Sequence, residues 1–308
     1  KQAIEYYKPL LQAANAEHLL VSNGSLLVFE KTADKDVVAM CTHYQQAGIA
    51  VELLNREQTL MLEPNLNDNI KQALFFKEVA HTGDPLAICV ALSDYAKSLG
   101  MEFKHLSVNS IKQVESGVVI NHLNENLSFD HCVVATGAYS KNILKELGYY
   151  LPIEAERGYS LSIKLAEYEQ ALLSRPVASA ERKFIITPMD NMLRLSGTVE
   201  YAGLHAEAND KRADMLLKNA RFVLKDLPEK ALSNNDYNRE RWMGVRPSLP
   251  DSLPVICQAP QHTNIFFALG HQHLGLTQGA ITGRLIGQLI SGQETEIDVS
   301  PFNISRFN

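Results

Sequence analysis

The part of this sequence that most restricts the fold is an apolar segment followed by a loop and a glycine-striped helix. Residues Asn264–Leu269 predict a buried strand, and the loop after it carries His271 and His273. The helix predicted over Leu276–Ser291 lacks side chains along one face, because a glycine recurs at every fourth position: Gly275, Gly279, Gly283 and Gly287. Each glycine inside a helix costs about 1 kcal/mol relative to alanine. The stripe therefore indicates that another backbone or a flat ligand packs there, or that the helix packs tightly on a sheet.

A second strand–turn–helix connection lies at Val133–Ser140. Its β-branched valines predict a strand, and Ala135, Thr136 and Gly137 form a turn of small residues before a helix. Small residues let a ligand approach the backbone, and the free N–H groups at a helix N-terminus attract anions. The same pattern fits an ordinary connection, so the residues alone leave both interpretations open.

A third segment, Trp242–Ile256, holds an arginine on a stiff stretch of backbone. Arg246 lies two residues after Gly244 and directly before Pro247. Its planar guanidinium suits a carboxylate, which it can bind through two parallel hydrogen bonds. A structural ion pair would use the same chemistry, and the sequence leaves the two roles equally open.

Helical and strand-like patterns alternate over the rest of the chain. The 308 residues are enough for about two domains. The mixture of alternating and fully apolar strand patterns predicts an α/β (α+β) fold with at least two sheets. The expected elements include a helix at Pro85–Ser98, capped by Asp84, and a strand at Glu102–Leu106.

Composition excludes several classes of protein. The formal net charge is -6 and no run of basic residues occurs, which argues against nucleic-acid binding. No apolar run approaches the ~20 residues that span a bilayer, although peripheral membrane contact stays open. The four cysteines are far apart in sequence, which favours a reducing compartment over a disulfide scaffold. The opening residues Lys1–Tyr7 read as helix interior, so we expect the sequence to begin within a longer protein.

Several common site motifs are absent from the sequence. None of the 17 glycines lies two positions from another, so GxGxxG cannot occur, and no Walker A motif is present. His271 and His273 have no nearby carboxylate or cysteine in the sequence to complete a metal site, so we expect no metal.

Together and in this order, the three segments resemble the D-amino-acid oxidase/dehydrogenase family of FAD-dependent amine oxidoreductases. Arg157–Leu161 and Leu195–Glu200 are similar to further strands of that family, and the resemblance covers nearly the whole chain. The residues at Arg246–Ile256 and Gly270–Thr277 are most similar to bacterial D-amino-acid dehydrogenases, including those acting on hydroxy-D-proline. The resemblance implies FAD as cofactor and an amino acid as substrate.

The resemblance also implies roles for individual residues. Arg246 matches the arginine that pairs with the substrate carboxylate, Tyr159 is a candidate to line the pocket, and His273 is a catalytic candidate on the adjacent loop. The implied cofactor-binding residues are Val108 at the adenine, Ala135, Thr136 and Gly137 near the pyrophosphate, Gly244, and Gly270, Gly275, Leu276 and Thr277 under the flavin.

The implied reaction is oxidation of the Cα–N bond of a D-amino acid. A hydride passes from Cα to the flavin N5, and the resulting imino acid hydrolyses to a keto acid. The N-terminus of the Leu276–Ser291 helix would stabilise negative charge on the reduced ring, and no general base is required if the amine binds neutral. The alternatives are a glycine- or sarcosine-type oxidase, and a flavin-free module without activity of its own.

The chain departs from the family in lacking a GxGxxG unit, which binds the ADP half of FAD. We therefore expect an incomplete FAD-binding Rossmann-like domain at residues 79–145 and 240–308, and a substrate domain with a mixed or antiparallel sheet at residues 1–78 and 146–239. We expect weak FAD retention, and self-association through the strand edge near Val133–Ala135. The electron acceptor is a quinone or oxygen, and the expected location is the cytoplasm, with the inner face of the membrane as an option.

Overall fold

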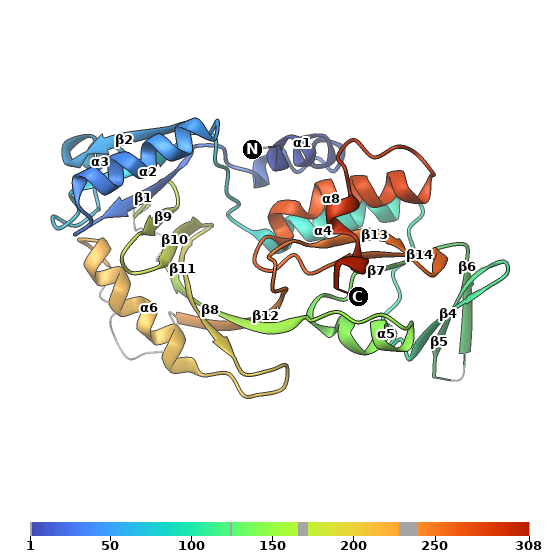
Figure 1. The fold of residues 1–308 in the computed structure, drawn as a ribbon. Coiled ribbons are helices and arrows are strands. Elements are labelled where there is room, and N and C mark those ends of the chain that lie inside the picture. Colours follow the sequence, from blue (N-terminus) through green and yellow to red (C-terminus); the bar gives the residue numbers. More distant parts are fainter. Residues whose placement is uncertain (1, 124, 166–171, 228–238, 308) are drawn as a thin grey trace.

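An eight-stranded sheet is the largest feature of the computed structural model, which describes residues 2–123, 125–165, 172–227 and 239–307 (Figure 1). Adjacent strands are antiparallel except for β1 and β9, which are parallel. In spatial order the strands are β12 (Arg239–Ser248), β8 (Glu154–Lys164), β11 (Met192–Tyr201), β10 (Phe184–Met189), β9 (Val177–Ser179), β1 (Ser25–Phe29), β3 (Gln72–Phe76) and β2 (Val51–Asn55).

Helices cover the two faces of this sheet unequally. On one face α6 (Asp210–Val223) and α3 (Arg56–Leu62) enclose the main core, to which β1 contributes Leu26 and Val28. On the other face α2 (Asp34–Gln46) packs only over β1, β2 and β3, where Phe29 meets Val37. No described α-helix packs on that face over β8, β10, β11 and β12 (Figure 1), and this face, called the open face below, carries the candidate site.

A second sheet has the order β13 (Val255–Ala259), β14 (His262–Leu269) and β7 (Cys132–Val134). The parallel pair β14 and β7 lies between α8 (Gly275–Ile290) on one face and α5 (Ser140–Glu146) on the other. Helices on both faces explain why Ile265–Leu269 of β14 are all apolar. Two further helices, α1 (Ala3–Ala13) and α4 (Pro85–Ser98), pack beside α8. A separate antiparallel sheet consists of β4 (Ser110–Val114), β5 (Gly117–His122) and β6 (Glu125–Phe129). Short 3-10 turns lie at Glu17–Leu19, Gly137–Tyr139 (η2), Ser300–Phe302 and Ile304–Phe307.

The predicted mixed α/β fold with more than one sheet is confirmed. The predicted helix α4 spans the expected residues, and the Asp84 carboxylate accepts hydrogen bonds from the N–H groups of Leu86 and Ala87. The predicted strand at Glu102–Leu106 is wrong, because residues 101–109 form no strand with any partner in the described chain. None of the described helices combines the length and apolar character needed to cross a membrane.

Two segments pack on a different side of the molecule from the one to which the expected domain division assigns them. Helix α1 falls in the range assigned to the substrate side, yet it packs against α4 and α8 (Figure 1). Strand β12 falls in the range assigned to the cofactor side, yet it forms the edge of the large sheet. Gly244 and Pro247 concealed this strand in the sequence, since both residues are tolerated at a sheet edge and disfavoured inside a sheet. Residues 166–171 and 228–238 of the expected substrate domain lie outside the described residues.

The turn between β9 and β10 is held by the carboxylate of Glu181. Its Oε1 accepts hydrogen bonds from the N–H groups of Glu30, Lys31 and Thr32 and from the Thr32 hydroxyl, at 2.7 to 3.1 Å. Partial burial opposes ionisation, but these hydrogen bonds outweigh it and lower the pKa of Glu181 from 4.5 to about 2. The anchored turn carries Lys183, which lines the cavity described below.

The lowered pKa predicts a pH-dependent contribution of Glu181 to stability. A carboxyl with a lower pKa in the folded chain stabilises the fold above its unfolded pKa and loses this effect as the pH falls through the folded value. Glu181→Gln should therefore lower the free energy of unfolding at pH 7, and the deficit should shrink between pH 4.5 and about 2. Urea unfolding of the wild-type protein and of Glu181→Gln across this pH range measures the deficit. A deficit independent of pH would contradict the lowered pKa of Glu181.

Candidate active site

A cavity of about 460 Å³ lies on the open face of the large sheet. Strands β8, β9, β10, β11 and β12 and the loop after β14 contribute its lining. Four of the lining residues carry charged or titratable side chains: Glu156, Lys183, Arg246 and His273. The cavity therefore brings together two of the predicted residues, Arg246 and His273, from segments that lie apart in the sequence.

Arg246 both lines the cavity and takes part in an ion pair. It faces Glu156 across the β12–β8 ladder, and its Nη1 lies 3.0 Å from the carboxylate Oε1. The guanidinium extends over Gly158, where an added Cβ would lie 2.4 Å from Cζ and Nη2. Both roles that the sequence left open are thus compatible with this geometry, because one arm of the fork meets Glu156 while the side chain remains 29% exposed.

The carboxylate of Glu156 is fixed from two directions. The Ser248 hydroxyl donates to Oε2, and Arg246 donates to Oε1. Burial alone would raise the pKa of Glu156, but the hydrogen bonds from Ser248 and Arg246, with the positive charge of Arg246, outweigh it and hold the pKa below its ordinary value. Glu156 is therefore ionised at neutral pH, and the cavity wall presents a fixed anion beside a fixed cation.

The loop after β14 is tied to the end of β12. The N–H of Gln272 donates to the carbonyl of Pro247 at 3.2 Å, and Gly270, with a φ of +72°, packs against Leu249. This tie brings His273 to the cavity. His271 points elsewhere, to the Thr282 hydroxyl at 2.9 Å, and burial lowers the pKa of its imidazole.

The predicted cofactor-side turns meet at one edge of the second sheet. Val134 of β7 is paired with Phe267 of the parallel strand β14, so the turn at Ala135–Gly137 and the loop from Gly270 follow the same end of both strands. Gly137 has a φ of +56°, a left-handed conformation that favours glycine.

The first turn of α8 leaves N–H groups at this edge without a side-chain cap. Leu274 precedes the helix and offers no capping side chain, and Gly275, Leu276 and Thr277 are exposed. Uncapped N–H groups and the positive end of the helix dipole attract negative charge. A Cβ built at Gly137 would meet nothing within 4 Å, so this edge has room for a flat, partly anionic group such as the flavin of FAD.

Three predicted residues lie outside both the cavity lining and the cofactor-side turns. Tyr159 is 2% exposed on the opposite face of β8, where its hydroxyl donates to Glu200 and accepts from the N–H of Asn209, so the structure does not bring it to the cavity as predicted. Gly244 shares the open face but lies under the ring of Trp242. Val108 is exposed between α4 and β4.

The residues that sequence reasoning missed are Glu156, Gly158, Ser248 and Lys183. Alternation along β8 could have placed Glu156 and Gly158 on one face of the strand, because side chains two residues apart share a face. Ser248 and Lys183 become visible only when β12 and the β9–β10 turn are placed beside them.

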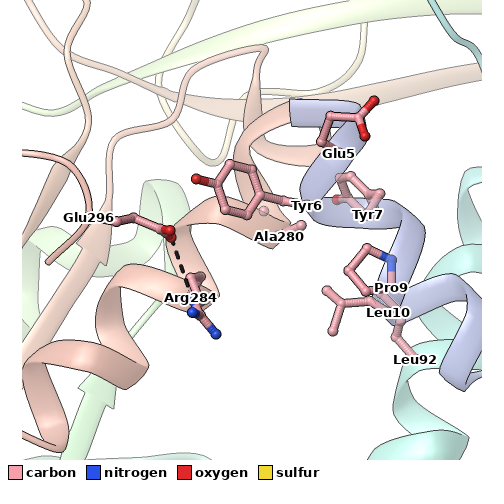
Figure 2. Close-up of a pocket in the computed structure, with 11 residues that line it drawn as sticks. Glu5, Tyr6, Tyr7, Pro9, Leu10, Leu92, Ala280, Arg284 and Glu296 are labelled. Carbon is pink, nitrogen blue, oxygen red and sulfur yellow. Dashed lines mark ion pairs between the residues drawn. The ribbon is translucent and has the colours of Figure 1, made fainter. Parts of the chain in front are cut away.

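The glycine stripe of α8 contacts α1 at Gly279 and lines a cavity at Gly283. Gly279 lies below Tyr7, whose hydroxyl donates to the carbonyl of Leu276. Further along, Gly283 lines a cavity of about 780 Å³ between α1, α4 and α8, and an added Cβ there would meet nothing within 4 Å (Figure 2). Arg284 and Glu296 form an ion pair beside it, with N and O 3.5 Å apart. The prediction that a backbone or flat ligand covers the whole stripe stays a prediction.

Comparison with known proteins places the chain among flavin-dependent oxidoreductases. Residues 1–289 match the family described as FAD dependent oxidoreductase (DAO). A D-amino-acid oxidase of Bradyrhizobium diazoefficiens is 31% identical over 309 aligned residues, covering 100% of this chain and 72% of that protein. A D-amino acid dehydrogenase of Vibrio atlanticus is 29% identical over 291 residues, covering 92% of this chain and 67% of that protein.

Solved structures share the fold. Glycine oxidase from Geobacillus kaustophilus superposes with a TM-score of 0.83 at 23% identity, covering 99% of this chain and 84% of that one. L-proline dehydrogenase from P. horikoshii gives a TM-score of 0.82 at 16% identity, covering 99% and 81%. From the extent of the family match, the chain belongs to the DAO family of FAD dependent oxidoreductases, enzymes whose cofactor is FAD.

Proposed function

We propose that this protein oxidises the Cα–N bond of a D-amino acid at the cavity on the large sheet. The observation that carries the proposal is the guanidinium of Arg246, held flat at the cavity wall beside an ionised Glu156. A free amino acid carries a carboxylate that this fork can bind. The D configuration rests on the two relatives named D-amino-acid oxidase and D-amino acid dehydrogenase.

The chain's own residues would hold the substrate and the cofactor. Arg246 binds the substrate carboxylate, which fixes Cα at a set distance from the cavity wall. The turn at Ala135–Gly137, Gly270 and the N–H groups of Gly275–Thr277 would hold FAD, which supplies the electron acceptor when bound. The substrate loses the Cα hydrogen with its electron pair and a proton from nitrogen, and water hydrolyses the imino acid to a keto acid, with release of ammonia where the amine is primary. His273 at the cavity is a candidate to contact the substrate.

The proposal extends to the partners of the reaction. The electrons leave to a quinone or to oxygen, and a quinone acceptor would place the protein at the inner face of the membrane. Four free cysteines among the described residues, three of them buried, are consistent with a cytoplasmic location. Self-association through the β7 edge also remains part of the proposal, since β7 is the outer strand of its sheet and Val133 is exposed.

Anaerobic reduction of the FAD-loaded protein tests the proposed function. D-alanine, D-proline or hydroxy-D-proline should bleach the flavin absorbance near ~450 nm, and L-alanine should not. Preferential bleaching by glycine or sarcosine would support a glycine-type oxidase instead. No bleaching by any amino acid, in protein that a chemical reductant does bleach, would overturn the proposal. Adding oxygen or a soluble quinone to the reduced protein then identifies the acceptor.

A further inference from the structure

We propose that Glu156 is a positioning residue that fixes the orientation of the Arg246 guanidinium before an amino acid binds. This inference rests on the proposed function, in which Arg246 binds the substrate carboxylate. The charge at Glu156 and the space at Gly158, two positions on the same face of β8, should therefore control the affinity for the substrate.

The first support is the geometry of the ion pair. Glu156 and Arg246 are directly opposed on neighbouring antiparallel strands, so the backbone sets the distance between them. Nη1 of Arg246 lies 3.0 Å from Oε1, and Glu156 is 9% exposed. An unpartnered arginine side chain samples many rotamers, and a fixed partner removes that freedom before binding.

The second support is that Glu156 is itself anchored. The Ser248 hydroxyl donates to Oε2, the oxygen that does not receive Arg246. Ser248 lies two residues after Arg246 on the same strand and therefore on the same face. The carboxylate is consequently held between two groups of β12, and its position does not depend on a bound ligand.

The third support is the space that Gly158 provides. A Cβ at this position would lie 2.4 Å from Cζ and Nη2 of Arg246 and 2.8 Å from Nε. The guanidinium therefore lies directly against the β8 backbone at Gly158, one same-face position from Glu156. Glu156 holds Nη1, and the missing side chain of Gly158 leaves room for Cζ, Nη2 and Nε. This combination fixes the orientation of the guanidinium.

The chain offers a direct probe of this surface. Trp242 is the single tryptophan and is 56% exposed on the same face of β12 as Arg246. Its ring lies over Gly244, the neighbour of Arg246 on that face, so its fluorescence should respond to a ligand bound at Arg246. A suitable ligand is 2-aminoisobutyric acid, an amino acid without a Cα hydrogen, which can bind and cannot be oxidised. Binding can thus be measured separately from turnover.

A double-mutant cycle tests the inference in the FAD-loaded protein. Glu156→Gln should weaken 2-aminoisobutyric acid binding about 10-fold, because a charge-assisted hydrogen bond to the arginine is lost. The same change in an Arg246→Lys background should weaken it less than about 2-fold, because residues that act through one another are not additive. KM for an oxidised amino acid should follow the same pattern.

The results separate this inference from the proposed function. Additive effects of the two changes, or tighter binding in Glu156→Gln, would overturn the positioning role while leaving the role of Arg246 intact. Unchanged binding in Arg246→Lys alone would overturn the proposed role of Arg246, and with it that of Glu156.

Two further variants guard against an effect on folding alone. Glu63→Gln removes a similarly buried carboxylate, whose Oε1 also lies 3.0 Å from an arginine, Arg175, outside this cavity; it should leave ligand affinity unchanged. Gly158→Ala keeps every charge and displaces only the flexible end of Arg246, so it should weaken binding at least as much as Glu156→Gln. Unchanged affinity in Gly158→Ala would show that the orientation of the fork is unimportant and would overturn the inference.

Discussion

Arg246→Lys is expected to raise KM for the amino-acid substrate about 10- to 100-fold, which corresponds to the ~1.5–3 kcal/mol of a hydrogen bond to a charged group. Lysine keeps the positive charge but cannot bind a carboxylate through two parallel donors. It also cannot reach Glu156 and the substrate from one planar group. Steady-state kinetics across several amino acids measure the effect, and it should appear for every substrate because all of them share the carboxylate.

Arg241→Lys is the matched control for this change. Arg241 lies on the same strand, on the face opposite to Arg246, where its Nε is 2.8 Å from Asp214 of α6. The substitution there should alter stability slightly and leave KM unchanged. Equal effects of the two substitutions, or no effect of either, would mean that Arg246 serves the fold and does not bind the substrate.

Gly270→Ala is expected to destabilise the fold by about 2–4 kcal/mol, combining a left-handed conformation unfavourable to alanine with overpacking of the core. The glycine has a φ of +72°, and an added Cβ would lie 2.2 Å from Cδ1 of the buried Leu249. The loop that carries His273 would have to move, so kcat/KM should fall as well. Thermal and urea unfolding, with kinetics on the folded fraction, measure the two effects.

Gly203→Ala separates the two causes. Gly203 has a φ of +71°, almost identical to that of Gly270, and an added Cβ would meet nothing within 4 Å. It should cost only the backbone strain, about 1 kcal/mol. If the two alanine variants are equally stable, the contact between Gly270 and Leu249 has no energetic weight and the loop is not fixed by it.

Local signals in the sequence predicted the elements that depend on local physics. Asp84 and Pro85 set the start of α4, and the apolar run of β14 indicated a strand covered on both faces. Elements that depend on a distant partner were harder to predict. Residues 102–106 have the pattern of a strand, but no strand pairs with them in the described chain. Strand β12 was missed because Gly244 and Pro247 weaken the local pattern that its pairing with β8 overcomes.

The candidate site shows the same division. Arg246 and His273 were predicted from segments with unusual local composition, and the structure brings both to one cavity. Tyr159 was predicted there from the resemblance of Arg157–Leu161 to a strand of the family, yet it faces the start of α6, since a shift of one residue along a strand reverses the face. Glu156 carries no local signal of its own, and its importance follows only from the register of β8 with β12.

The link between Gln272 and Pro247 has a consequence for how the molecule opens. It joins the end of the small sheet to the edge strand of the large sheet at the cavity itself, and the side chain of Gln272 also reaches the carbonyl of Leu249. The two sheets therefore cannot separate here without exposing the Gln272 amide to solvent. Hydrogen exchange at that single amide should accordingly report separation of the sheets, slow when they fluctuate as one unit and fast when they part.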